Sequence, residues 1–235
     1  MPIHRRFFAL TTTGVAALLT LSLTACGAAP HRPAPTKVVS KYLTAISEGD
    51  ATTAARLDSE AVNNTYRTST SDQDESDLGS LRTDSVLQSA DERIEKVQVK
   101  TNPKSVQGED DTLEIGFTYE LNGKEHSSAL TVHWSPESSE WVLEDSLTVQ
   151  LFVDAQKSTV QTQSAPFRIV GIQDSLRPSE EGLPYMYLVY PGVYRVTADI
   201  PKGLLAPNTE TSQTVTADTS GDARATFEVL ELPTY

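Results

Sequence analysis

Apolar and polar residues alternate through residues 113–121, and this pattern limits the fold more than any other feature of the chain. The apolar positions are Leu113, Ile115, Phe117, Tyr119 and Leu121. Successive side chains of a strand point to opposite faces, so the alternation predicts a strand with one buried face. Asn122-Gly123 follows at once, and this dipeptide is typical of a two-residue type I′ hairpin turn. Such a turn gives the pairs Leu121–Lys124, Tyr119–His126, Ile115–Leu130 and Leu113–Val132, with the apolar residues of both strands on one face.

Helical periodicity precedes this hairpin. Apolar residues at i, i+4, i+7 and i+8 predict a helix over residues 37–48, with Thr36 as its cap. Gly49 suits the residue after that helix, where φ is positive, and Asp50 suits the N-cap of a second helix reaching about Val62. A third helix is expected over residues 82–93. Strands are expected around Val97–Val99 and Trp141–Leu143, which makes residues 36–146 an α+β domain.

Residues 147–235 show no helical period, and they read as short strands separated by Gly- and Pro-containing turns. Strands are expected at residues 147–153, 167–172, 185–190, 193–200, 213–217 and 225–232. This spacing predicts a second, all-β domain, an antiparallel sandwich. The tyrosines of this region are assigned to its core, the alternative being an aromatic platform for a glycan or peptide. They are Tyr185, Tyr187, Tyr190 and Tyr194.

Two stretches resemble known families. The helix pair around Tyr42, Gly49-Asp50 and Leu57, with the later "YELNGKEHSSALTVHW", is similar to NTF2-like domains of Gram-positive, especially actinobacterial, surface lipoproteins. The stretch "YLVYPGVYRVTADI" is similar to PEGA-like and transthyretin-like sandwiches. The resemblance implies a cone of helices on a curved antiparallel sheet, followed by a sandwich. NTF2-like folds also host isomerase-like and cyclase-like enzymes, so the fold alone does not decide function.

The amino terminus has the pattern of a secretory signal. Arg5 and Arg6 precede an uncharged stretch over residues 7–25, which is also just long enough for a membrane span. Leu23-Thr24-Ala25-Cys26 resembles the lipobox of bacterial lipoproteins. That resemblance implies a signal peptide over residues 1–25, a diacylglyceryl group on Cys26, and a position on the extracytoplasmic face of the cell membrane. Residues 26–35 contain three prolines and are expected to form a short tether.

Charge and cysteine content exclude several classes of protein. The chain has 19 Lys and Arg against 32 Asp and Glu, with no basic block, so we expect no nucleic-acid partner. Its single cysteine excludes an internal disulfide and a Cys-rich zinc site. The acidic residues Asp72, Asp74, Glu75 and Asp77 miss the calcium-loop pattern, because Asp77 stands where that loop needs glycine. We interpret them as a solvated loop.

Catalytic chemistry has no positive support in the sequence. No nucleophile-elbow, zinc-protease or phosphate-loop motif occurs. The carboxylates of Glu114, Glu120 and Glu144 are expected opposite the apolar face, which leaves Tyr119 and His126 as a polar pair near the rim of the cone. His133 points away from His126, so the two cannot share a metal ion, and no metal or cofactor is expected.

The function expected is therefore non-catalytic binding or scaffolding in the cell envelope, with an envelope protein or a small apolar ligand as partner. Two alternatives stay open: a pocket enzyme of the isomerase or cyclase type, and a carrier or sensor of a small apolar or lipid ligand. A ligand pocket would be lined by Phe117, Tyr119, His126 and Trp134.

Overall fold

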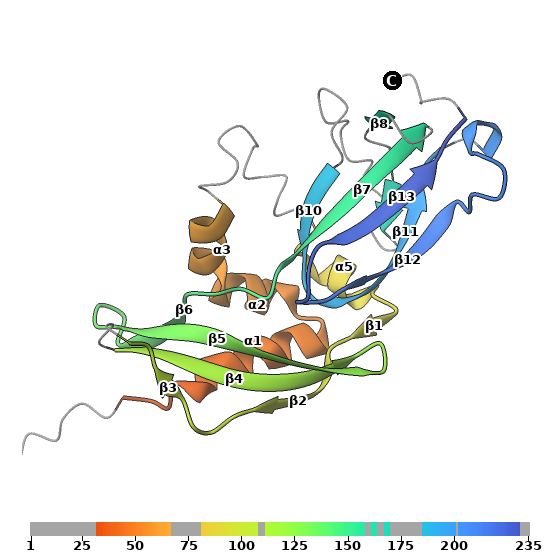
Figure 1. Ribbon diagram of the computed structural model, residues 1–235. Coiled ribbons are helices and arrows are strands. Elements are labelled where there is room, and N and C mark those ends of the chain that lie inside the picture. Colours follow the sequence, from red (N-terminus) through yellow and green to blue (C-terminus); the bar gives the residue numbers. More distant parts are fainter. Residues whose placement is uncertain are drawn as a thin grey trace, which may run out of the picture. The chain divides into compact units, whose positions relative to one another are not determined.

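The described part of the chain begins with helices and continues mostly in strands, as the computed structural model shows (Figure 1). The structure describes residues 32–66, 81–107, 111–157, 161–163, 167–169, 185–200 and 202–230. The fold is α+β, as predicted, with curled, mainly antiparallel sheets. Within these ranges no helix is both long and apolar enough to cross a membrane.

Helix α1 (Thr36–Glu48) buries the apolar face predicted from its periodicity, including Tyr42 and Ile46. Thr36 does not cap the helix as expected: it is the first helical residue, the N-cap is Pro35, and no side chain caps this end. The other end is as predicted. Gly49 has a φ of 83°, and the Asp50 side chain accepts a 2.8 Å hydrogen bond from the Thr53 backbone N–H.

The expected second helix is divided. Helix α2 (Ala51–Leu57) ends at Asp58, and α3 (Ser59–Tyr66) follows directly. The third helix, α5 (Asp84–Gln88), is shorter than the range 82–93, because Glu92–Arg93 form strand β1 instead. The acidic loop around Asp72 lies outside the described residues.

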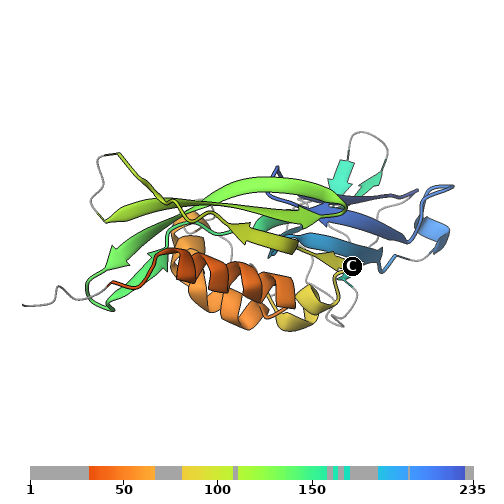
Figure 2. The same cartoon turned by 90° about the horizontal axis from the view of Figure 1, so that it is seen from below.

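The first sheet has the predicted hairpin at its centre. Its strands are β2 (Glu95–Val99), β3 (Lys104–Ser105), β4 (Thr112–Leu121), β5 (Lys124–Ser135) and β6 (Glu140–Leu143). Their order is β2-β4-β5-β6, with β3 paired to β4. All four cross-strand pairs predicted for β4 and β5 are confirmed, and Asn122 and Gly123 have φ values of 51° and 66°. Positive φ at both positions is what a type I′ turn requires. Figure 2 shows α1 lying along one face of this sheet.

Two further sheets are built from the carboxy-terminal strands. Their strands are β7 (Val149–Lys157), β8 (Gln161–Gln163), β9 (Phe167–Ile169), β10 (Tyr185–Val189), β11 (Gly192–Ala198), β12 (Ser212–Ala217) and β13 (Ala223–Glu228). In one sheet the strand order is β1-β11-β12, and β9 also pairs with β11. In the other sheet the order is β10-β7-β13, and β8 also pairs with β7. A 3₁₀ turn, η2 (Lys202–Leu204), follows β11. The expectation of a wholly antiparallel arrangement is wrong at one place, because β13 runs parallel to β7.

The first sheet and the carboxy-terminal strands share buried residues. Strand β1 pairs with β11, and Tyr190 and Val193 belong to the apolar cluster that α1 forms with the first sheet. Conversely, Leu81 and Val86 pack into the cluster between the two carboxy-terminal sheets. The described residues from Arg32 onward accordingly belong to one compact unit. A division into domains at residues 146 and 147 stays a prediction.

Candidate functional site

The structure brings together three of the four residues expected to line a pocket. Phe117 and Tyr119 are fully buried, with ring centroids 6.1 Å apart, and His126 stacks on Tyr119 at 5.0 Å. The Tyr119 hydroxyl lies 3.0 Å from Oγ1 of Thr219, within hydrogen-bond distance. Burial is the main reason that the pKa of Tyr119 is raised above 10. Tyr119 and His126 are paired, as predicted, but Tyr119 is a core residue and only His126 is partly exposed.

Trp134 lies elsewhere. It is eight positions beyond His126 on β5, which corresponds to about 26 Å along the strand. Its ring packs edge-on against Trp141, with centroids 5.6 Å apart. The predicted signal residues Leu23, Thr24 and Ala25, together with Cys26, lie outside the described residues.

The space between α1 and the first sheet is occupied by the chain's own side chains. Val39, Leu43, Ile115 and Leu130 are each at most 1% exposed and belong to one cluster with Phe117. The strand carboxylates lie outside this cluster, as predicted, and pair with surface bases. Glu120 is 2.5 Å from Lys96 and Glu114 is 3.8 Å from Lys104. Glu144 is 3.1 Å from His133, although the geometry there is not that of a hydrogen bond.

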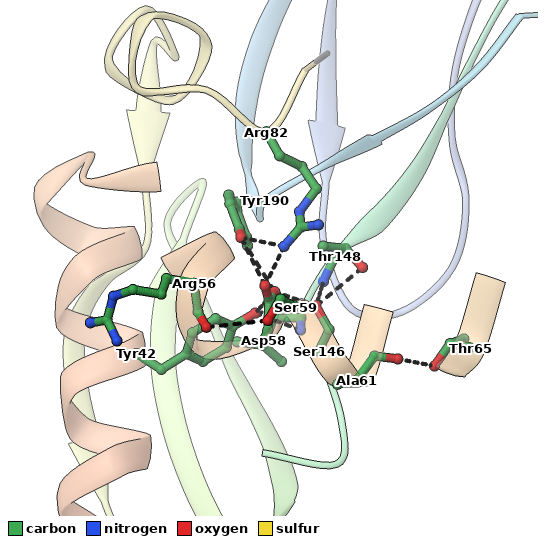
Figure 3. A network of polar contacts seen from close by, with 11 residues as sticks. Tyr42, Arg56, Asp58, Ser59, Ala61, Thr65, Arg82, Ser146, Thr148 and Tyr190 are labelled. Carbon is green, nitrogen blue, oxygen red and sulfur yellow. Dashed lines mark hydrogen bonds and ion pairs between the residues drawn. The ribbon is translucent and has the colours of Figure 1, made fainter. Parts of the chain in front are cut away.

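One carboxylate that the sequence analysis did not single out is buried. Asp58, at the break between α2 and α3, has no solvent exposure. Its Oδ2 accepts hydrogen bonds from the Tyr42 hydroxyl at 2.9 Å and from Ser146 at 2.7 Å (Figure 3). Its Oδ1 pairs with Nη2 of Arg82, and the Tyr190 hydroxyl lies 3.3 Å from both carboxylate oxygens. Nη2 of Arg82 also donates to the Tyr190 hydroxyl at 2.9 Å.

The charges of this network are compensated internally. Burial and the nearby Asp58 charge raise the pKa of Tyr42 and of Tyr190 far above 10, so both stay neutral donors. Burial acts to lower the pKa of Arg82, but the neighbouring Tyr190 and Asp58 groups outweigh it and the pKa is raised. Arg82 is therefore a fixed cation beside Asp58. Its Nε is buried and has no hydrogen-bond partner among the described residues.

This arrangement is suited to holding elements together. Its members come from α1, the α2–α3 break, the segment before α5, the β6–β7 connection and the residue after β10. Catalysis by a carboxylate requires hydrogen-bond access to a substrate. The Asp58 oxygens are instead occupied by protein donors and are shielded from solvent.

A shallow polar opening lies beside this network. Its volume is about 370 Å³, and its walls include Tyr66 on α3, Thr148 and Gln150 at the start of β7, and Asp218 and Asp222 in the β12–β13 turn. Thr148 accepts a 3.2 Å hydrogen bond from the Ser146 hydroxyl, which connects the opening to Asp58. Most of the residues that line it are polar, but polar and apolar surface contribute to the wall in similar shares, so the wall by itself does not select the kind of ligand.

Comparison of the chain with protein-family models, characterised proteins and solved structures finds no match.

The role of Asp58 could not be predicted from the sequence, because no residue near it in the chain indicates which groups it contacts. Arg82 and Tyr190 stand 24 and 132 positions away. The only local signal is Asp58 itself. It is a charged residue within the helical pattern, between Leu57 and Ala61, at the position where α2 ends. Among the described residues, no three His, Cys, Asp or Glu side chains form a group that could hold a metal ion.

Proposed function

We propose that this chain is a bacterial lipoprotein, anchored through diacylglyceryl-Cys26 to the extracytoplasmic face of the cell membrane, that acts in non-catalytic binding or scaffolding in the envelope. One observation carries the anchoring: Leu23-Thr24-Ala25-Cys26 ends an uncharged stretch that follows Arg5 and Arg6. The order of positive residues, apolar stretch, small residues and cysteine is that of a lipoprotein signal.

The charge of the chain supports a lipid as the anchor. Removal of Arg5 and Arg6 with the signal changes the formal charge from −13 to −15. Anionic headgroups repel such a chain, so electrostatic attraction does not hold it at a membrane. Each buried CH₂ group contributes about 0.8 kcal/mol, and two acyl chains give stable attachment where one is marginal.

The filled interior supports scaffolding over catalysis or transport. The cluster around Phe117 leaves the aromatic residues packed against protein, and Asp58 is satisfied by its own neighbours. An isomerase-type site needs an accessible base and a proton donor facing a cavity. A carrier of apolar ligands needs an apolar cavity. The packing of the described residues favours neither alternative.

The finer fold assignment belongs to the same proposal. We infer an NTF2-like cone from α1 lying on the curved first sheet, and a PEGA-like or transthyretin-like sandwich from the two carboxy-terminal sheets that share one buried cluster. Burial of Tyr187, Tyr190 and Tyr194 supports the interpretation of these tyrosines as core residues.

The anchoring is tested by metabolic labelling with palmitate in a bacterial host. We expect the chain to be labelled and to sediment with membranes, and Cys26→Ala to lose the label. Thr24→Ser keeps a small residue before the cysteine and serves as the matched control, which should stay labelled. Persistent labelling of Cys26→Ala would overturn the anchoring.

The binding role is tested by cross-linking in native membranes. Recovery of a defined envelope protein, with no copurified lipid or small molecule, supports scaffolding. Recovery of a stoichiometric lipid in the purified protein would favour the carrier instead. Turnover of a small ketone-like substrate would contradict the non-catalytic role.

A further inference from the structure

Both tryptophans of the chain contact the segment that leads into the first helix. Arg32 lies over the Trp134 ring, with its guanidinium carbon 4.8 Å from the ring centroid. The indole Nε1–H of Trp141 donates a 2.8 Å hydrogen bond to the Pro33 carbonyl. The Arg32 guanidinium also forms a two-point ion pair with Asp111, the residue before β4. We call residues 32–35 the strap.

Four features hold the strap against the sheet. They are the ion pair, the cation–π contact, the indole hydrogen bond and the direct continuation of Pro35 into α1. The hydrogen bond between Arg32 and Asp111 keeps the pKa of that carboxyl below its usual value, so the pair is charged at neutral pH. Pro33 and Pro35 limit the backbone freedom that fastening removes. The strap therefore has a defined direction relative to the sheet, whereas a tether without these contacts would have none.

The strap lies at one end of the first sheet, and the carboxy-terminal sheets contact the other end. Asp111 and Trp134 mark the strap end of the β4–β5 hairpin. At the turn end, the side-chain amide of Asn122 donates a 3.1 Å hydrogen bond to Thr216 on β12, and the Asn122 backbone N–H donates to Glu92. Strand β4 has ten residues, so about 33 Å separates these two ends.

We propose that the strap fixes the orientation of the anchored chain at the membrane: the β5–β6 turn faces the lipid, and the carboxy-terminal sheets lie on the side away from it. This inference rests on the proposed acylation of Cys26. Six peptide units join Cys26 to Arg32 and span at most about 21 Å, so the strap end of the sheet must stay near the headgroups. Arg32, Asp111, Trp134 and Trp141 are thus positioning residues for the whole molecule.

The orientation is measured by energy transfer from single probes to an acceptor on lipid headgroups. Acylation consumes the thiol of Cys26, so Ser138→Cys in the β5–β6 turn and Lys202→Cys after β11 each give one labelling site. Both positions are exposed. The acylated full-length protein is placed in phosphatidylglycerol–phosphatidylethanolamine vesicles. We expect severalfold more transfer from residue 138 than from residue 202. Equal transfer from the two positions would overturn the proposal.

Variants test whether the strap is the cause of that difference. Arg32→Gln removes the ion pair and the cation–π contact at a residue whose side chain is 44% exposed. Combined with Trp141→Phe, it should bring the two transfer efficiencies together while the protein stays bound to vesicles. Lys104→Gln breaks an exposed ion pair on the neighbouring β3 and is the matched control, which should keep the difference. A difference that survives loss of the strap contacts would overturn the role of the strap.

Tryptophan emission separates failure of the strap from failure of the anchor. Because both tryptophans contact the strap, Arg32→Gln should shift the emission in detergent, without any membrane. Unchanged emission overturns the strap itself. A protein whose emission responds but which does not associate with vesicles instead overturns the anchoring and, with it, the orientation.

Discussion

At the scale of single residues, Asp58 is the position where one substitution should lower the free energy of unfolding most. Asp58→Ala leaves the Arg82 cation without its carboxylate and removes the acceptor of three hydroxyl groups. Breaking a buried ion pair by removing one partner costs about 3–5 kcal/mol. We expect the free energy of unfolding to fall by that amount, measured by urea unfolding followed by circular dichroism.

The exposed ion pair between Asp91 and Arg195 provides the control. Its side chains are 40% and 53% exposed, so Asp91→Ala should cost less than about 1 kcal/mol. The double variant Asp58→Leu with Arg82→Met should be more stable than Asp58→Ala, because no uncompensated charge remains. Equal losses of unfolding free energy in Asp58→Ala and Asp91→Ala would show that the buried network contributes no more to stability than an exposed ion pair.

The buried tyrosines predict a loss of stability at alkaline pH. Burial raises the pKa of Tyr42, Tyr190 and Tyr194 above the ordinary value of 10. These groups hold their protons in the folded state at pH values where the unfolded chain has released them. Their contribution is complete below pH 10 and is lost as the pH rises above it. Urea unfolding across pH 9–12 should show this decline in stability. Tyr194→Phe should make the decline with pH shallower. If the slope in this variant is unchanged, Tyr194 does not contribute to the decline.

At the scale of elements, the junction between α1 and α2 depends on the backbone of Gly49. Its φ of 83° lies in the left-handed region, and a Cβ there would stand 2.9 Å from Cγ of Gln88. We expect Gly49→Ala to lower the free energy of unfolding by about 1–2 kcal/mol. Gly203 in η2 has neither a positive φ nor a neighbour within 4 Å, so Gly203→Ala should be neutral or slightly stabilising. Thermal unfolding of both variants checks this difference.

The elements that could be predicted are those whose determinants are local. Asn122-Gly123 fixed a turn, the turn fixed the register of β4 and β5, and the register placed Tyr119 opposite His126. Gly49 and Asp50 likewise marked a helix boundary through their own backbone and side-chain properties. Thr36 misled the prediction because Pro35 is already helical in its backbone angles and serves as the N-cap.

The features that could not be predicted from the sequence depend on contacts between distant segments. Asp58 acquires its role only when Arg82 and Tyr190 are brought to it. The parallel pairing of β13 with β7 joins Phe227 to Ala155 across a long connection, and alternation within a strand does not state the direction of its neighbour. The hydrogen-bond partner of the Tyr119 hydroxyl, Thr219, similarly lies far along the chain, in the turn after β12.

At the scale of the whole molecule, the described segments behave as mutually dependent parts. Tyr190 and Val193 complete the cluster under the first sheet, while Leu81 and Val86 complete the carboxy-terminal cluster. The Asp58 network and the pairing of β1 with β11 cross the same junction. Separating either part would therefore expose apolar surface and leave the Asp58–Arg82 pair without Tyr190. Such contacts make cooperative unfolding the expected behaviour.

This cooperativity has a direct test, because both tryptophans report only on the strap end of the first sheet. Val196→Ala removes two methyl groups from the carboxy-terminal cluster, where Val196 is fully buried, and should cost about 2 kcal/mol. In a cooperative molecule the urea midpoint followed by tryptophan fluorescence shifts by the full amount, although Val196 does not belong to the cluster under the first sheet. Thr214→Ala, at an exposed position on the neighbouring β12, should leave the midpoint unchanged. If Val196→Ala spares the tryptophan transition but lowers protection of the β11 amides from hydrogen exchange, the two regions unfold separately, as independent domains would.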